Sequence, residues 1–347
     1  MRLLTPLPQD DLHDARAAAV AAEAAGYDGV VTMENRNEPF LALGVAAVAT
    51  SRVELHTGIA IAFARSPMAV ANAAWDLQVA SRGRFVLGLG SQIRAHNENR
   101  FSVPWSAPAP RLREYVEALR AIWRAWQTGA KLDHRGQHYR FTLMTPNFTP
   151  RSTGQPMVPV TIAAVGPAML RLAGEVCDGV RLHPFCTRRY VDEVVLPQLQ
   201  AGMARSGRAR KHFEISGGGF IATGPDEAAV ARMVEWVRSR VAFYGSTPAY
   251  WPVLEVHGLA ELGRKLNVMS KAGQWEQMAE ISDDVVRLFA AVGPHGGIAR
   301  EIESRFGGAA DAVAISGGYG MHQDVPSDVV RDIQRIPSVF AGYQTTW

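Results

Sequence analysis

The chain has 347 residues, of which 47% are hydrophobic and 20% charged, with a formal net charge of +3 and an isoelectric point near 9.0. This composition excludes a disordered chain, because it supplies enough apolar residues for a substantial core. The basic residues are scattered rather than gathered in one run or stripe, so we expect no nucleic-acid partner.

The chain lacks the sequence features of membrane-spanning, secreted and disulfide-rich or zinc-binding proteins. No apolar run approaches the roughly 20 residues of a membrane-spanning helix, and residues 1–10 lack the basic and apolar regions of a secretory signal. Cys177 and Cys186 have neither the number nor the spacing of a disulfide framework or a zinc site. We therefore expect a cytoplasmic protein with no membrane partner and no bound metal.

Short apolar runs alternate with amphipathic runs along the chain, which is the pattern of parallel βαβ units. The runs predicted as strands are 3–6, 28–34, 53–61, 84–91, 158–166, 178–184, 213–223 and 312–318. Helices are predicted over 11–25 and 39–50, from Pro67 onward, and over 111–127. Eight strands in this order predict an α/β protein, a (β/α)8 TIM barrel that forms a single domain over residues 1–347.

Two intervals are longer than a βα unit requires. Residues 92–110 form an irregular loop after the fourth strand, and residues 244–296 contain helical pieces after the seventh helix. A hairpin is predicted at 132–141, where Arg135 and Gly136 make the turn. We expect the two long intervals to be insertions into the barrel.

The loops that follow the strands are the expected place for chemistry, because parallel barrels carry their active sites at the carboxyl ends of the strands. Gly90 and Ser91 end the fourth strand, where glycine permits close approach of a ligand. His183 ends the sixth strand, and an ionisable ring there is expected in the barrel mouth. The fifth strand passes through Gly166 and Pro167 into a helix, which is either a phosphate site or an ordinary βα turn.

Several familiar sites are disfavoured by the sequence. The Gly88–Gly90 run lacks the third glycine of a dinucleotide-binding fingerprint. No serine-hydrolase elbow of the type GxSxG and no HExxH zinc motif occurs.

Several runs occur in the order seen in luciferase-like monooxygenases, and the chain resembles this superfamily over nearly its whole length. They are GYDGVVTME at 26–34, TGIAIAFARSP at 57–67, GRFVLGLGS at 83–91, PVTIAAVGP at 159–167 and AGEVCDGV at 173–180. FARSP followed by AWDLQ, the run REYVEALRAIWRAWQTG and the HPF after the sixth strand resemble oxidoreductases that use coenzyme F420, a deazaflavin.

The resemblance implies positions for the coenzyme. The family's non-prolyl cis peptide, in a bulge of the third strand, corresponds to Ala60–Ile61. The coenzyme phosphate would bind on the turn after the fifth strand, at Ala163, Ala164, Val165, Gly166 and Pro167. Arg65, Arg94 and Arg36 are candidates to contact the acidic oligoglutamate tail, or else ordinary surface arginines.

The chain departs from the family at the proton-relay residues. Relatives often carry an acidic residue followed by histidine after the second strand, whereas here Glu34 is followed by Asn35. The sugar-phosphate dehydrogenase of the branch carries an acid after the fourth strand, where this chain has Ile93. Glu34, His96 and His183 remain as candidates for a general acid or base.

The leading hypothesis is an oxidoreductase that transfers a hydride between F420 and a small organic substrate that the sequence does not identify. An FMN-dependent monooxygenase on the same barrel is one alternative, and a flavin-binding protein without turnover is another. The resemblance also implies a homodimer through the second and third helices.

Overall fold

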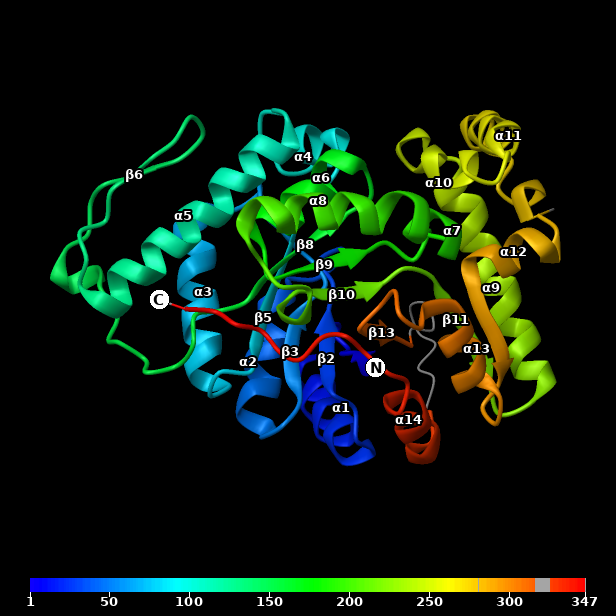
Figure 1. Cartoon of the computed structure of the whole chain (residues 1–347), viewed down its shortest axis with the longest axis horizontal. Helices are drawn as coiled ribbons and strands as arrows, with labels where there is room; N and C mark the ends of the chain where they lie inside the picture. The colour runs from blue at the N-terminus through cyan, green and yellow to red at the C-terminus, as the bar shows by residue number, and fades with distance from the viewer. Residues whose placement is uncertain (280, 316–324, 347) are drawn as a thin grey trace.

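The computed structural model describes residues 1–279, 281–315 and 325–346 (Figure 1). Ser316, Gly317 and Gly318, expected at the end of the eighth strand, lie outside these ranges. None of the helices in these ranges combines the length with the apolar character of a membrane-spanning segment.

The core of the molecule is a closed barrel of parallel strands. Its strands are β1 (Arg2–Pro6), β2 (Gly29–Thr32), β3 (Glu54–Thr57), β4 (Ala60–Ile61), β5 (Phe85–Gly90), β8 (Val160–Ala164), β9 (Gly179–Leu182), β10 (Glu214–Gly217) and β13 (Ala312–Ala314). They follow the order β3-β2-β1-β13-β10-β9-β8-β5-β4, and β3 also pairs with β5. Because β3 and β4 are two parts of one strand, this pairing closes an eight-stranded barrel, and the predicted fold is confirmed.

Helices surround the barrel. They are α1 (Leu12–Ala25), α2 (Pro39–Ala49), α3 (Pro67–Ala80), α5 (Pro108–Thr128), α6 (Pro167–Val176), α8 (Leu196–Ser206), α9 (Glu227–Gly245), α13 (Ile298–Phe306) and α14 (Ser327–Gln334). Local sequence sets their ends. Ser66 accepts a hydrogen bond from the Met68 N–H at the start of α3, and Gly26 ends α1 at a φ of 92°.

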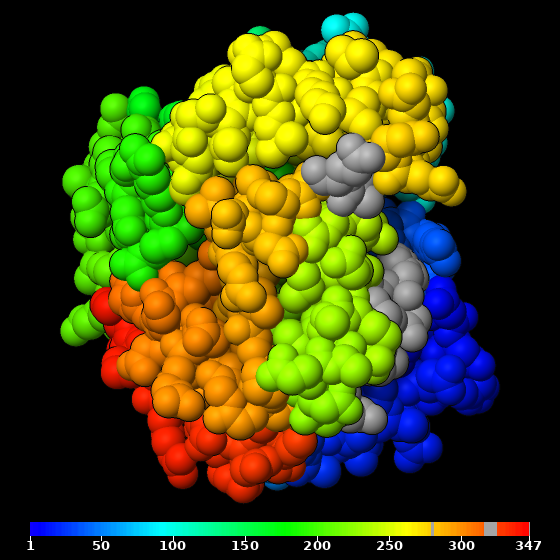
Figure 2. All heavy atoms as spheres, turned by 90° about the vertical axis from the view of Figure 1, so that its right-hand side faces the viewer, coloured from blue at the N-terminus to red at the C-terminus, as the bar shows by residue number. Residues whose placement is uncertain are grey.

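The intervals expected as insertions contain their own elements. The loop after β5 holds α4 (Arg94–Asn99), and β6 (His134–Arg135) pairs antiparallel with β7 (Arg140–Phe141), which confirms the predicted hairpin. The later interval contains α10 (Trp251–Glu255), α11 (Ala260–Lys271) and α12 (Asp283–Phe289). Figure 2 shows α10 and α11, in yellow, forming one end of the molecule.

The seventh strand differs from the prediction. Residues 213–223 do not form one strand, because Gly217 and Gly218 turn the chain at φ values of 87° and 105°. The chain continues as β11 (Phe220–Gly224), which leaves the barrel and pairs in parallel with β12 (Ala290–Pro294). The short α7 (Arg188–Tyr190) precedes α8.

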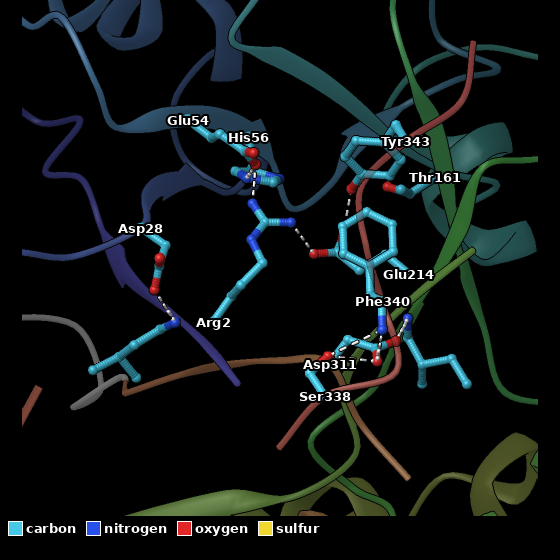
Figure 3. Close-up of polar contacts among 12 residues, drawn as sticks. Arg2, Asp28, Glu54, His56, Thr161, Glu214, Asp311, Ser338, Phe340 and Tyr343 are labelled. Carbon is cyan, nitrogen blue, oxygen red and sulfur yellow. Dashed lines mark hydrogen bonds and ion pairs between the residues drawn. The ribbon is translucent and has the colours of Figure 1, made fainter. Parts of the chain in front are cut away.

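The amino-terminal end of the barrel is closed by charged side chains and by the segment after α14 (Figure 3). Arg2 forms ion pairs with Glu54 and Glu214. The Tyr343 hydroxyl donates to the Glu214 carboxylate over 2.6 Å, and the Phe340 N–H donates to Asp311. This floor leaves the opposite, carboxyl end of the barrel as the place for a ligand.

Candidate active site at the carboxyl end of the barrel

A β-bulge interrupts the strand formed by β3 and β4. Leu55 pairs with Phe85 and Ala60 with Leu89, so five steps on one strand face four on the other, and one residue is extra. The bulge contains a cis peptide bond between Gly58 and Ile59. The expected position, Ala60–Ile61, is therefore wrong by two residues, because those residues are already paired with β5.

Glycines make the close packing around the bulge possible. A Cβ on Gly58 would lie 2.5 Å from Val31 Cγ2, and one on Gly90 would lie 2.6 Å from Ile59 Cδ1. Gly90, predicted to face a ligand, also makes room for the side chain of Ile59. Its neighbour Ser91 is partly exposed, and its carbonyl accepts a hydrogen bond from Asn97.

Glu34 holds the backbone of β4 just after the bulge. Its carboxylate accepts the Ile61 N–H over 2.6 Å and the Arg65 guanidinium over 2.7 and 2.8 Å, and its side chain is 8% exposed. Arg65 also faces Glu38 at 3.5 Å. A proton-transfer role was predicted for Glu34 and a tail contact for Arg65. The structure brings the two side chains together in one ion pair beside the bulge.

His183 lies at the end of β9 against aromatic rings. Its ring centroid is 4.4 Å from that of Tyr244 and 4.7 Å from that of Tyr250, and burial lowers its pKa to about 4. Nδ1 accepts the Phe185 N–H over 2.9 Å, so the neutral ring carries its proton on Nε2. His183 is therefore a neutral hydrogen-bond donor near pH 7.

We expect His183 to make the protein sensitive to mild acid. Its folded pKa of about 4 lies below the roughly 6.5 of an unfolded histidine. As the pH falls, the unfolded chain therefore binds the proton before the folded chain does. The contribution of His183 to the free energy of unfolding is fully present above pH 6.5 and is lost as the pH drops toward 4. The loss should be about 2–3 kcal/mol, because the ring retains some solvent access.

Urea unfolding of the wild type and His183→Asn across pH 7 to 4 measures this loss. Asparagine keeps an acceptor for the Phe185 N–H but does not titrate, so its profile should be flatter. His96→Asn, on the exposed face of α4, is the matched control and should follow the wild type. Parallel profiles for His183→Asn and the wild type would contradict the assignment.

The start of α6 carries backbone N–H groups without a capping side chain. Gly166 is the N-cap and makes no side-chain hydrogen bond, while Pro167 and Ala168 are exposed. Ala163 and Ala164 end β8, and the Val165 carbonyl accepts the Tyr190 hydroxyl over 3.0 Å. This arrangement offers an anion the first-turn N–H groups of α6.

The remaining predicted site residues lie on the surface. His96 and Arg94 are exposed on α4, where Arg94 is 69% exposed and pairs with Glu98 at 3.0 Å. Arg36 is exposed in the loop after β2. The structure does not place these three side chains at the bulge.

Arg181 is a residue that the sequence analysis missed. It projects from β9 into the barrel, where Nε donates to Thr161 Oγ1 over 3.2 Å and Nη2 donates to His56 Nδ1. Strand periodicity could have found it, because residues two apart share a face and Arg181 lies two before His183.

Relatives of known and unknown function match most of the chain. An uncharacterized protein of Mycobacterium tuberculosis is 51% identical over 305 residues, covering 88% of this chain and 90% of that protein. The 5,10-methylenetetrahydromethanopterin reductase of Archaeoglobus fulgidus is 29% identical, covering 78% and 80%. A putative coenzyme F420-dependent oxidoreductase of M. tuberculosis is also 29% identical, covering 78% and 75%.

Solved structures share the fold. The F420-dependent tetrahydromethanopterin reductase of Methanopyrus kandleri superposes with a TM-score of 0.77 at 19% identity, covering 96% of this chain and 97% of that one. The oxygenating constituent of 3,6-diketocamphane monooxygenase from Pseudomonas putida, in complex with FMN, gives 0.66 at 13% identity, covering 97% of each. Residues 2–312 match the luciferase-like monooxygenase family, and the chain belongs to that family.

Proposed function

We propose that this protein is an oxidoreductase that binds coenzyme F420 at the carboxyl end of the barrel and transfers a hydride to or from a small organic substrate. The observation that carries the proposal is that the Gly58–Ile59 bulge and the uncapped start of α6 both lie at the carboxyl end of the barrel. The relatives named for F420 chemistry, which match about four fifths of the chain, support the deazaflavin over FMN.

The residues present fit a flavin-like group. β4, which follows the bulge, and β8, which leads into α6, are both neighbours of β5, so they lie about 10 Å apart at the usual strand spacing. A flat ring against the bulge and a phosphate at Ala168 would then be joined by a short chain across the end of β5. The phosphate would accept the first-turn N–H groups, where the helix dipole favours an anion.

The coenzyme would supply the carbon that accepts or releases the hydride, and the protein would orient the reactants. Glu34 and Arg65 hold the bulge through the Ile61 N–H. His183 presents its Nε2 proton beside Tyr244 and Tyr250, where it can donate a hydrogen bond to a substrate oxygen. The aromatic wall limits the access of water to that hydrogen bond.

Titration of the apoprotein with F420 and with FMN, followed by fluorescence, tests the proposal. We expect F420 to bind at least tenfold more tightly than FMN. Ala168→Asp, which adds a carboxylate at the exposed α6 start, should weaken F420 binding more than tenfold by repelling the phosphate. Ala168→Asn is the matched neutral control and should change affinity less than threefold.

Tight FMN binding without F420 binding would instead favour the FMN-dependent monooxygenase, which could use the same α6 start. Unchanged F420 affinity in Ala168→Asp would remove the phosphate from this site. Turnover against a panel of carbonyls, alcohols and imines separates an enzyme from a binding protein, since a bound coenzyme that reacts with none of them is inert.

We propose further that α2 docks against a second copy of this chain. The helix contains no polar residue, and Leu41 and Val48 on its outer face are 60% and 78% exposed. A helix that is apolar on all sides is normally buried. Val79, on α3, which packs against α2, is also exposed, at 49%.

We expect Val48→Glu to convert a dimer into a monomer at micromolar concentration in size-exclusion chromatography with light scattering. Val268→Glu changes an equally apolar residue, 66% exposed on α11, and should leave the mass unchanged. A wild-type protein that elutes as a monomer at all concentrations would contradict this assignment.

A further inference from the structure

Arg181 places a cation inside the barrel, directly under the bulge. Its Nη1 lies 3.6 Å from the position that a Cβ on Gly58 would occupy, and its Nε lies 2.8 Å from the corresponding position on Gly88. Both glycines belong to the strands that carry or face the bulge. The absence of side chains at these two positions makes room for the guanidinium.

The partners of Arg181 are neutral. His56 joins it to the floor of the barrel, because His56 Nε2 donates to Glu54 over 2.9 Å while Nδ1 accepts from Arg181. This pattern uses the single proton of a neutral ring, and complete burial lowers the pKa of His56. The hydroxyl of Thr161 is the other partner.

The two glutamates of the network pair with Arg2, as Figure 3 shows, and within the described residues neither forms an ion pair with Arg181. Glu54 and Glu214 flank Arg2 at the floor, and the Tyr343 hydroxyl also binds Glu214. Burial alone would raise the pKa of Glu54, but the hydrogen bond from His56 and the charge of Arg2 hold it at about 2. Arg2 therefore binds two carboxylates, whereas Arg181 has none among its hydrogen-bond partners.

One arm of the Arg181 guanidinium is accessible and lies beside Gly58 of the bulge. Nε and Nη2 are used by Thr161 and His56, whereas within the described ranges Nη1 has no hydrogen-bond partner. Nη1 is also absent from the sealed polar atoms that lack a partner, and the side chain is partly exposed. Because this accessible donor lies next to Gly58, we place it within reach of a ligand held against the bulge.

We infer that Arg181 supplies a positive charge beneath the ring-binding site and stabilises negative charge on a reduced ring held against the Gly58–Ile59 bulge. This inference rests on the proposed function. A hydride brings two electrons and one proton, so a neutral ring gains one negative charge unless a second proton follows. A fixed guanidinium in a partly dry site lowers the energy of that charge without reorganising.

The inference predicts a change in the relative affinities of two cofactor states. In Arg181→Gln, which keeps a hydrogen-bond donor but loses the charge, reduced F420 should lose at least tenfold in affinity relative to oxidised F420. For a two-electron couple this corresponds to a midpoint potential about 30 mV lower for the bound cofactor. Both dissociation constants and the potential can be measured without substrate.

Two variants separate charge from structure. Arg181→Lys keeps the charge and should hold the ratio of affinities within about threefold of the wild type, even if its melting temperature falls. Arg84 is a partly buried arginine just before β5, and its guanidinium donates to the carbonyls of Ala47 and Thr50. Arg84→Gln removes this charge at a distance from the bulge. It should lower stability and leave the ratio unchanged.

The outcomes distinguish the two proposals. An unchanged ratio in Arg181→Gln, with F420 still bound, overturns the role of Arg181 and leaves the proposed function intact. A wild type that binds neither F420 nor FMN overturns the proposed function and this inference with it. If Arg181→Gln does not fold, the lysine variant decides, since a tenfold loss of the ratio with the charge retained contradicts the inference.

Discussion

Replacing Gly88 with alanine is expected to lower the free energy of unfolding by about 3 kcal/mol or more. The new Cβ would lie 2.0 Å from the backbone oxygen of Thr57, which cannot move without disrupting the strand. The Thr57 hydroxyl both accepts the Gly88 N–H and donates to the Gly88 carbonyl, each over 2.8 Å. An added methyl would therefore separate β3 from β5 at the point where the barrel closes.

Thermal and urea unfolding measure this effect, with Gly296→Ala as the matched control. Gly296 lies in the turn between β12 and α13, and a Cβ there would meet nothing within 4 Å. Its φ lies outside the left-handed region, so this variant should be neutral or slightly stabilised. Equal stability of Gly88→Ala and the wild type would mean that β3 and β5 can separate without cost.

The second large effect is expected for Glu34→Gln, which should cost about 2–3 kcal/mol of stability and greatly reduce binding of F420. The change leaves the Arg65 guanidinium facing a neutral amide in a site where Glu34 is 8% exposed. Neutralising Glu34 leaves Arg65 with only its longer ion pair to Glu38, at 3.5 Å, which does not replace the lost charge. The amide oxygen can still accept the Ile61 N–H, but the two contacts with Arg65 are weakened.

Glu98→Gln tests the same chemical change at the surface. Its partner Arg94 is 69% exposed, and exposed pairs contribute about 0–1 kcal/mol. Unfolding free energies and F420 titrations of both variants should therefore differ clearly. If Glu34→Gln retains full stability and affinity, the ion pair does not hold the bulge.

The barrel could be predicted because its pattern is local. Apolar runs, turns and helix caps repeat along the chain, and each can be recognised without knowing its partner. The seventh strand could not be bounded in this way, because Gly217 and Gly218 lie between two short β-like runs, FEIS at 213–216 and FIAT at 220–223, that together resemble one strand. Only the backbone angles show that the chain turns there.

The site was harder to predict because it depends on contacts between distant segments. The bulge is defined by counting β3 and β4 against β5, which requires the register of the partner strand. Glu34 and Arg65 were each recognised as functional candidates, yet the sequence does not show that they bind each other. The neutral state of His183 depends on Tyr244 and Tyr250, more than 60 positions away in the chain.

The pairing of β11 with β12 has a consequence for how this enzyme family can diversify. Five residue pairs, from Phe220↔Ala290 to Gly224↔Pro294, bring the two ends of the long excursion together outside the barrel. A chimera that receives the segment between these strands from a relative would keep the bulge and the α6 start. It would replace the aromatic wall around His183. If the proposed function holds, selection could exchange the part of the site that contacts the substrate while the part that binds the coenzyme is inherited unchanged.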